Sequence, residues 1–138
     1  MDAKAMQLLG TKHTMVVHGL DGIDEISVCG PTRVSEIRDG QLLSYDIRPE
    51  LYFEDLAQRE DIMGGDPDVN VGITRNILAG KEHGPKRNIV LLNAAAALTL
   101  AGKADDLHKG VKLAAEAIDS GAAEAKLYAM MEFINNNS

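Results

Sequence analysis

The sequence predicts an α/β fold in which a partial sheet, including a β-hairpin, packs against several helices. Two observations lead to this prediction. Short runs of strand character occupy the first part of the chain, at Met15–Val17 and between residues 32 and 47. From Asp66 onward, apolar residues recur at helical spacing instead. A chain of 138 residues can bury a sizeable core, so we expect residues 1–138 to form a single domain.

The composition limits the classes of function. A formal net charge of −7 argues against a surface that binds nucleic acid or anionic membrane. Cys29 is the only cysteine, which excludes an intramolecular disulfide and fits a reducing cytoplasm. The first residues lack the pattern of a signal peptide, and no apolar run is long enough to cross a bilayer. The sequence therefore indicates a cytoplasmic protein without nucleic-acid or membrane partners.

The strands are predicted from short apolar and alternating runs. The run Met15–Val17 follows a helix that covers Ala3 to Leu9, and this order is typical of a repeated α/β unit entered partway. The domain is therefore expected to be truncated. Residues 26–29 predict a second short strand. Residues 32–38 and 42–47, joined by the turn signal Asp39-Gly40, predict a hairpin at a sheet edge.

Five further helices are predicted from caps and spacing, with Asp105 or Asp106 as the cap of the fourth. Asp66-Pro67 is typical of a helix start. The helix that follows Gly84-Pro85 is apolar almost all round, so it is expected to be buried rather than to lie on the surface. Asn93 within that helix needs a hydrogen-bond partner, and we expect it to connect two buried elements. Met130 and Met131 are expected to fill the core, and residues 135–138 are expected to be a disordered tail. The expected ranges are 49–56, 66–80, 84–101, 105–120 and 123–134.

The segment His18–Ser27, HGLDGIDEIS, is the candidate site. Adjacent Asp24 and Glu25 on a glycine-containing loop could hold a divalent cation that takes its other ligands from water and phosphate. Asp21 could share that cation or could bind its own backbone in the turn. Spacing alone also fits a solvated acidic turn. His18 could act as a general base, although a structural role fits its position at a strand end better. No catalytic residue is predicted.

Three stretches together resemble anthranilate phosphoribosyltransferase. They are VVHGLDGIDEIS, the run GGDPDVNVGITRNILAG, and GPKRNIVLLNAAAALTLAGKADDLHKGVKLAAEAIDSGAA. The similarity extends from about Ala5 to Leu127 in the same order. It implies the C-terminal part of the phosphoribosyltransferase/nucleoside phosphorylase α/β domain.

The resemblance implies a transferase that moves a phosphoribosyl group from phosphoribosyl diphosphate to the amine of anthranilate in tryptophan biosynthesis. It implies Mg²⁺ as the cofactor, with Asp24 and Glu25 as its ligands. The metal would neutralise the diphosphate leaving group while charge develops on the ribose.

The chain departs from the family because the N-terminal motifs are absent. The glycine-rich GTGGD loop that cradles the diphosphate has no counterpart in these 138 residues. We therefore expect the isolated chain to be inactive and its open sheet edge to favour a homo-oligomer or a partner chain. The alternatives are a fragment of a related pyrimidine nucleoside phosphorylase and a non-catalytic oligomerisation or interaction remnant.

Overall fold

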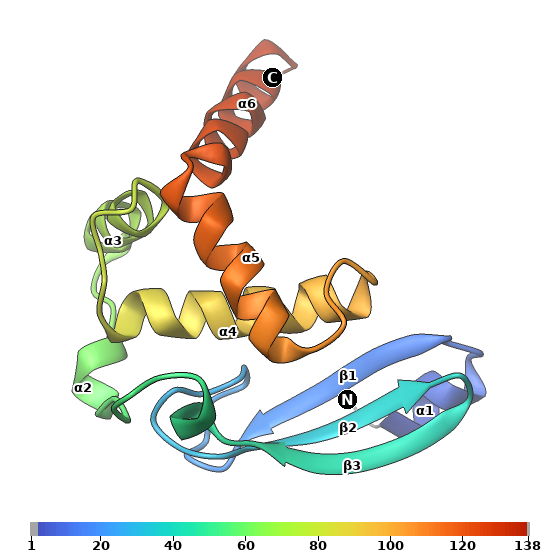
Figure 1. The fold of residues 1–138 in the computed structure, drawn as a ribbon. Helices are drawn as coiled ribbons and strands as arrows, with labels where there is room; N and C mark the ends of the chain where they lie inside the picture. The colour runs from blue at the N-terminus through green and yellow to red at the C-terminus, as the bar shows by residue number, and fades with distance from the viewer. Residues whose placement is uncertain (1–2, 138) are drawn as a thin grey trace.

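The computed structural model describes residues 3–137 and shows a three-stranded antiparallel sheet covered by helices (Figure 1). The predicted fold of helices around a sheet with a hairpin is confirmed. The strands are β1 (His13–Gly19), β2 (Thr32–Arg38) and β3 (Gln41–Ile47). The helices are α1 (Ala3–Leu8), the 3₁₀ turn η1 (Pro49–Leu51), α2 (Arg59–Ile62), α3 (Pro67–Leu78), α4 (Pro85–Leu100), α5 (Leu107–Asp119) and α6 (Ala122–Asn136).

The hairpin of β2 and β3 forms as predicted. Asp39 and Gly40 both have positive φ, 50° and 79°, as this tight turn requires. The turn sets a register in which Val34 of β2 lies opposite Tyr45 of β3. On its other side β2 pairs with β1, so that Val17 also lies opposite Val34. Strand β2 is therefore the central strand of the sheet.

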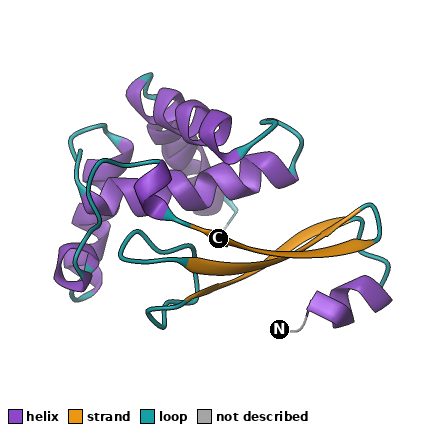
Figure 2. Ribbon diagram, turned by 60° about the horizontal axis from the view of Figure 1, so that its bottom comes forward, coloured by secondary structure: helices purple, strands orange, loops and turns teal. Residues whose placement is uncertain are grey.

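Helix α4 covers one face of the sheet, and α1 lies on the opposite side near the β2–β3 turn (Figure 2). The side chain of Gln7 in α1 donates a hydrogen bond to the carbonyl of Gly40 at 2.8 Å. Leu92 of α4 and Val34 of β2 are both fully buried where the helix meets the sheet. The core between these layers consists of Ile26, Val28, Val34, Ile47, Ala57, Leu92 and Ala96.

Helix α5 packs directly on α4 because glycine lets the two backbones approach. A Cβ added at Gly110 would lie 2.8 Å from the Cβ of Ala95. A second core cluster joins α3, α4 and α5 beside this crossing, through Ile77, Leu91, Ala114 and Ile118. The predicted caps also form, since Asp66 accepts from the amide of Val69 and Asp106 from that of Lys109.

Two predicted elements differ in the structure. Residues 26–29 do not form a strand, because side chains and the Ala57 amide, rather than a neighbouring strand, bind their backbone. For example, Ser27 N–H donates to Thr32 Oγ1 at 2.9 Å, and the Val28 carbonyl accepts from Ala57 N–H at 3.1 Å. The helix expected over residues 49–56 is only the turn η1. It stops where Tyr52 and Phe53 turn back to pack against the core.

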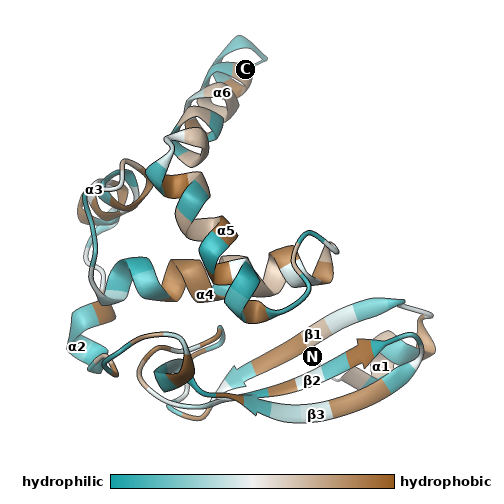
Figure 3. Ribbon diagram, viewed as in Figure 1, coloured by the Kyte–Doolittle hydropathy of each residue, from teal (hydrophilic) through white to brown (hydrophobic). Residues whose placement is uncertain are grey.

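The burial of α4 agrees with expectation, whereas that of α6 differs. Within α4 only Val90, at 37%, and Ala97 are exposed, because the sheet covers one side of the helix and α5 packs on another. Apolar residues occupy the middle of this helix (Figure 3). Helix α6 extends away from the sheet and contains no buried residue. Met130 and Met131 are 53% and 37% exposed, so the expectation that they fill the core is wrong.

The C-terminal end of α6 reaches further than the sequence suggested. Its helical hydrogen bonding continues to Asn136, while Ser138 lies outside the described residues. The disordered tail over residues 135–138 stays a prediction. Within residues 3–137, no helix has both the length and the apolar character needed to span a bilayer.

Candidate metal-binding loop

The acidic loop begins where β1 ends and returns to the start of β2. Gly19 N–H donates to the carbonyl of Ile23 at 2.8 Å, and Leu20 N–H donates to that of Pro31 at 2.9 Å. A Cβ at Gly19 would lie 2.5 Å from Asp21 Oδ1 and 3.0 Å from the carbonyl oxygen of Ile23. Glycine at this position lets the loop close on itself without displacing these two oxygens.

Asp21 is used within the loop. Its Oδ1 accepts from the amide of Ile23 at 3.3 Å, and its Oδ2 accepts from the hydroxyl of Ser27. Ser27 Oγ accepts in turn from the amide of Cys29 at 3.0 Å. Both carboxylate oxygens of Asp21 thus stabilise the turn, which favours the turn role over a shared metal ligand.

Asp24 and Glu25 lie on the exposed part of the loop. Neither side chain has a hydrogen bond or ion pair with another residue in the described range 3–137. Burial, and then the negative charge of Asp24, raise the pKa of the Glu25 carboxyl. The two adjacent carboxylates repel each other, and their oxygens bind no other residue of the described range. Together they provide a partial site for a cation.

This donor set fits Mg²⁺ only as a partial site. Within residues 3–137, no three His, Cys, Asp or Glu side chains come together to hold a metal ion. Mg²⁺ is commonly held by one or two carboxylates, with water and substrate phosphate supplying the remaining oxygens. Asp24 and Glu25 are suited to that arrangement, because a cation bound between the two carboxylates would offset the repulsion between their charges.

A shallow hollow of about 300 Å³ lies beside Glu25. Its walls come from α2, α3 and α4, with polar atoms from Asn70, Thr74 and Lys86. Lys86 Nζ donates to the carbonyl of Asp61 at 2.9 Å. A larger hollow of about 550 Å³ lies between residues 52–57 and the start of α4, and neither Asp24 nor Glu25 lines it.

His18 and Cys29, at the two ends of the loop, show no activated chemistry. His18 is exposed at the end of β1, and its side chain has no hydrogen-bond partner among residues 3–137. Burial, followed by the charge of Asp21, raises the pKa of the Cys29 thiol. A raised pKa disfavours the thiolate, so Cys29 is not an activated nucleophile.

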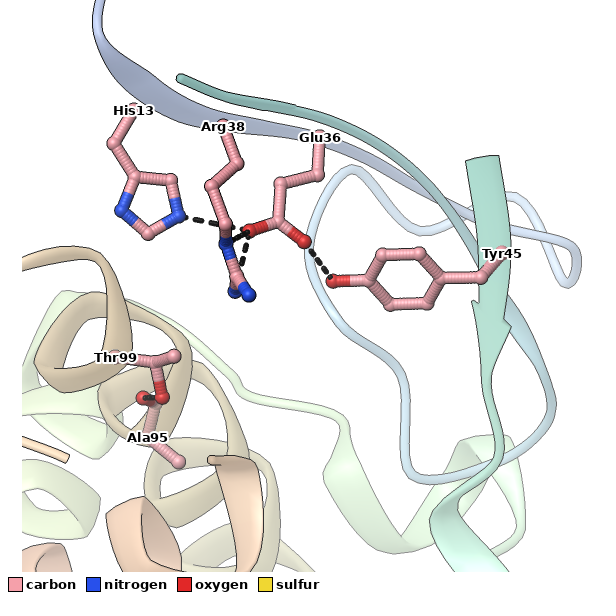
Figure 4. A network of polar contacts seen from close by, with 6 residues as sticks. All are labelled: His13, Glu36, Arg38, Tyr45, Ala95 and Thr99. Carbon is pink, nitrogen blue, oxygen red and sulfur yellow. Dashed lines mark hydrogen bonds and ion pairs between the residues drawn. The ribbon is translucent and has the colours of Figure 1, made fainter. Parts of the chain in front are cut away.

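A second polar cluster surrounds Glu36 on the central strand (Figure 4). Glu36 Oε1 accepts from Arg38 Nε at 3.0 Å and lies 2.8 Å from His13 Nε2. The hydroxyl of Tyr45 donates to Oε2 at 2.8 Å. Burial raises the pKa of Glu36, but these hydrogen bonds and the charge of Arg38 outweigh it and hold the pKa below its usual range. This buried carboxylate is fully partnered, so the cluster connects the three strands rather than forming a site.

Sequence reasoning missed the partners that shape the loop. Ser27 and Thr32 carry no motif, and nothing near them in sequence shows that their hydroxyls bind the loop backbone. The one available signal was Asn93, a polar residue in an apolar helix. As expected, it connects two buried elements: Ile26 N–H donates to Asn93 Oδ1 at 2.9 Å, and Asn93 Nδ2 donates to the carbonyl of Ile26 at 2.8 Å.

Residues 1–124 match the model of a protein family described as "Glycosyl transferase family, a/b domain". The chain belongs to this family. A relative named anthranilate phosphoribosyltransferase, from Desulfosudis oleivorans, is 57% identical over 137 residues. This alignment includes 99% of the chain and 40% of the relative, so the chain spans about 40% of the length of the curated relatives it matches.

Solved structures agree with this assignment. The crystal structure of anthranilate phosphoribosyltransferase from Thermus thermophilus superposes with a TM-score of 0.85 at 37% identity, covering 96% of this chain and 39% of that one. The Saccharomyces cerevisiae protein in complex with PRPP (phosphoribosyl diphosphate) and Mg superposes at 0.82 with 26% identity, covering 90% and 36%. The resemblance expected from the sequence motifs is confirmed.

Proposed function

We propose that this chain supplies the magnesium-binding loop and adjoining helices of an anthranilate phosphoribosyltransferase. The observation that carries the proposal is the pair of unpartnered carboxylates, Asp24 and Glu25, on a loop whose third acid, Asp21, is bound within the turn. The reaction transfers a phosphoribosyl group from PRPP to the amine of anthranilate. The names of the relatives favour this activity over the alternative of a pyrimidine nucleoside phosphorylase.

Asp24 and Glu25 would hold Mg²⁺ against the diphosphate of PRPP. The bound metal would neutralise the leaving diphosphate while positive charge develops on the ribose. The chain's own contribution is positional, because the loop presents two carboxylates from a backbone held at both ends. The single cysteine of the sequence supports a reducing compartment, the cytoplasm, for this function.

The proposed activity depends on parts that these 138 residues do not contain. No GTGGD run is present to cradle the diphosphate with backbone amides. The isolated chain is therefore proposed to be inactive. Mixing it with a polypeptide that carries the remaining segments of the family should restore turnover, and absence of turnover would favour a non-catalytic remnant.

We also propose that another polypeptide surface covers the open edge of β1. This strand pairs with β2 on one side, and no other strand within residues 3–137 pairs with it. An uncovered edge with apolar Met15, Val16 and Val17 favours association, either with a second copy or with a partner chain. Light scattering after size exclusion would test this, and a clean monomer at high concentration would contradict the second-copy arrangement.

The metal assignment is tested by calorimetry with Mg²⁺ and PRPP. The wild-type chain and the control Asp55→Asn, an exposed acid outside the loop, should give the same binding heat. Asp24→Asn should weaken the Mg²⁺-dependent binding by at least about tenfold, a loss that even outer-shell partners of a metal commonly cause. Equal heats from all three proteins, or heat from none, would overturn the site.

A further inference from the structure

Asn93 lies in the middle of α4, and its side-chain amide binds the backbone of the residue that follows Glu25. Ile26 N–H donates to Asn93 Oδ1 at 2.9 Å, and Asn93 Nδ2 donates to the carbonyl of Ile26 at 2.8 Å. The same Nδ2 also donates to the carbonyl of Ile89, one turn earlier in α4, at 2.9 Å. One side chain thus connects the helix to a loop residue 67 positions away.

Ile26 depends on this contact because it is buried but belongs to no strand. Its exposed fraction is 1%, and its side chain packs in the core cluster that contains Leu92. A buried backbone amide and carbonyl without partners would be costly, and water has little access here. A primary amide can accept and donate at the same time, so Asn93 satisfies both groups. The third bond, to Ile89, fixes the orientation of the amide.

The two hydrogen bonds between the Asn93 side chain and the Ile26 backbone form a clamp, and this clamp determines the position of the two metal-binding candidates. Asp24 and Glu25 lie between the turn closed by Gly19 and Ile23 and the fixed residue Ile26. Their side chains bind nothing else among residues 3–137, so the flanking backbone decides where they point.

We propose that Asn93 is a positioning residue that holds the Asp24–Glu25 pair in the geometry that binds a divalent cation. This rests on the proposed function for the metal, but the clamp itself can be measured without metal. Asn93 touches no reacting atom and acts through the backbone of Ile26.

Nuclear magnetic resonance of the full 138-residue chain tests the clamp in the wild-type protein. The amide of Ile26 should exchange with solvent much more slowly than the amide of exposed Asp24, although both lie in a loop. Mn²⁺ alone serves as the metal probe, since it takes the same oxygen ligands as Mg²⁺. It should broaden the signals of residues 23–26 before those of other residues.

Two variants separate positioning from general stability. Asn93→Leu keeps the approximate size but removes all three hydrogen bonds. The exchange rate of the Ile26 amide should rise by at least about tenfold, because a factor of ten corresponds to the loss of one buried hydrogen bond or more. Asn93→Gln keeps the amide but extends it by one methylene. It should shift the signals of residues 23–26 and weaken Mn²⁺ binding several-fold.

The matched control is Thr99→Val on the same helix. Thr99 is also buried, and its hydroxyl donates to the carbonyl of Ala95 at 2.9 Å within α4. This variant should lower the stability of the fold but leave the loop signals and Mn²⁺ affinity unchanged. If the Asn93 variants behave like Thr99→Val, Asn93 is only a structural residue and the proposal is overturned.

The remaining outcomes are also decisive. If the wild-type chain shows no Mn²⁺ broadening near Asp24 while Asn93→Leu still releases Ile26, the metal assignment fails and the clamp stands. If Asn93→Leu does not fold, the exchange rate of the Ile26 amide in the wild type still tests the clamp. The loop signals and Mn²⁺ affinity of Asn93→Gln then test the positioning role. Fast exchange of Ile26 in the wild-type chain would overturn the clamp itself.

Discussion

The sheet body, formed by β1–β3, the acidic loop, α4 and α5, differs sharply in burial from the flank formed by α3 and α6. In the sheet body, Val34 and Leu92 are fully buried, and polar groups such as Glu36 are partnered. In the flank, Tyr128 and Phe133 are 57% and 69% exposed, and α6 contains no buried residue. The contacts within this chain therefore specify the sheet body, whereas the flank offers apolar surface that this chain does not cover.

The difference between the two regions also affects the site. The acidic loop belongs to the sheet body, since Asn93 and Thr32 hold it from α4 and β2. Its geometry is therefore defined within the chain even though most of the proposed active site is not. The flank should matter for association with another polypeptide, while the sheet body should matter for stability and for the metal.

The largest expected contrast comes from truncating an apolar side chain in each region. Leu92→Ala removes a fully buried side chain from the core and should lower the free energy of unfolding by about 3 kcal/mol. Met130→Ala in α6, where the side chain is 53% exposed, should change it by less than about 0.5 kcal/mol. Urea denaturation followed by circular dichroism measures both. Similar losses would mean that the flank is packed as tightly as the core.

Glycine to alanine substitutions should have opposite signs in the two regions. At Gly110 the new Cβ would lie within 2.9 Å of the backbone of Ala95, so Gly110→Ala should destabilise by about 2 kcal/mol through overpacking. At Gly72 in α3 no atom lies within 4 Å of the new Cβ. Gly72→Ala should therefore stabilise by about 0.5–1 kcal/mol through helix propensity. The same urea titrations measure the unfolding free energy of both variants. Stabilisation by Gly110→Ala would contradict the close α4–α5 crossing.

The charge cluster in the sheet should make stability depend on pH. Because the pKa of Glu36 is depressed in the folded state, its contribution is present above its ordinary value of 4.5 and is lost as the pH falls through the lower folded value. Glu36→Gln should cost about 1.5 kcal/mol at neutral pH, the lower value for hydrogen bonds to a charged group.

The control for Glu36 is an exposed acid. Glu50 lies 3.8 Å from Arg48 at the surface, so Glu50→Gln should cost at most a few tenths of a kcal/mol. The cost of Glu36→Gln, measured as the difference in unfolding free energy from the wild type, should shrink in acid below pH 4.5. A cost that does not vary with pH would show that the Glu36 charge is not what stabilises the sheet.

The smallest effect on stability is expected from a charge on the flank. Phe133→Asp should change the unfolding free energy by less than about 0.5 kcal/mol, since Phe133 is 69% exposed. It should nevertheless weaken any association through α6, which size exclusion with light scattering would measure. Unchanged association would place the contact elsewhere, for instance at the β1 edge.

Local signals in the sequence determined several features of this protein. The Asp39-Gly40 turn, the aspartate caps at Asp66 and Asp106, and the strands of the hairpin depend on residues within a few positions of one another. Such patterns can be read directly, and the family motifs could be read in the same way. The acidic loop was also visible, because its glycines and carboxylates are adjacent.

Only the tertiary structure decided how that loop is held and what covers each helix. Residues 26–29 had the pattern of a strand, but Asn93 and Thr32 took the place of a neighbouring strand. Met130 had the spacing of a core residue, but whether a helix face is buried depends on what packs against it. Contacts between residues as far apart as Ile26 and Asn93 depend on how the chain returns on itself, and no short-range pattern encodes that path.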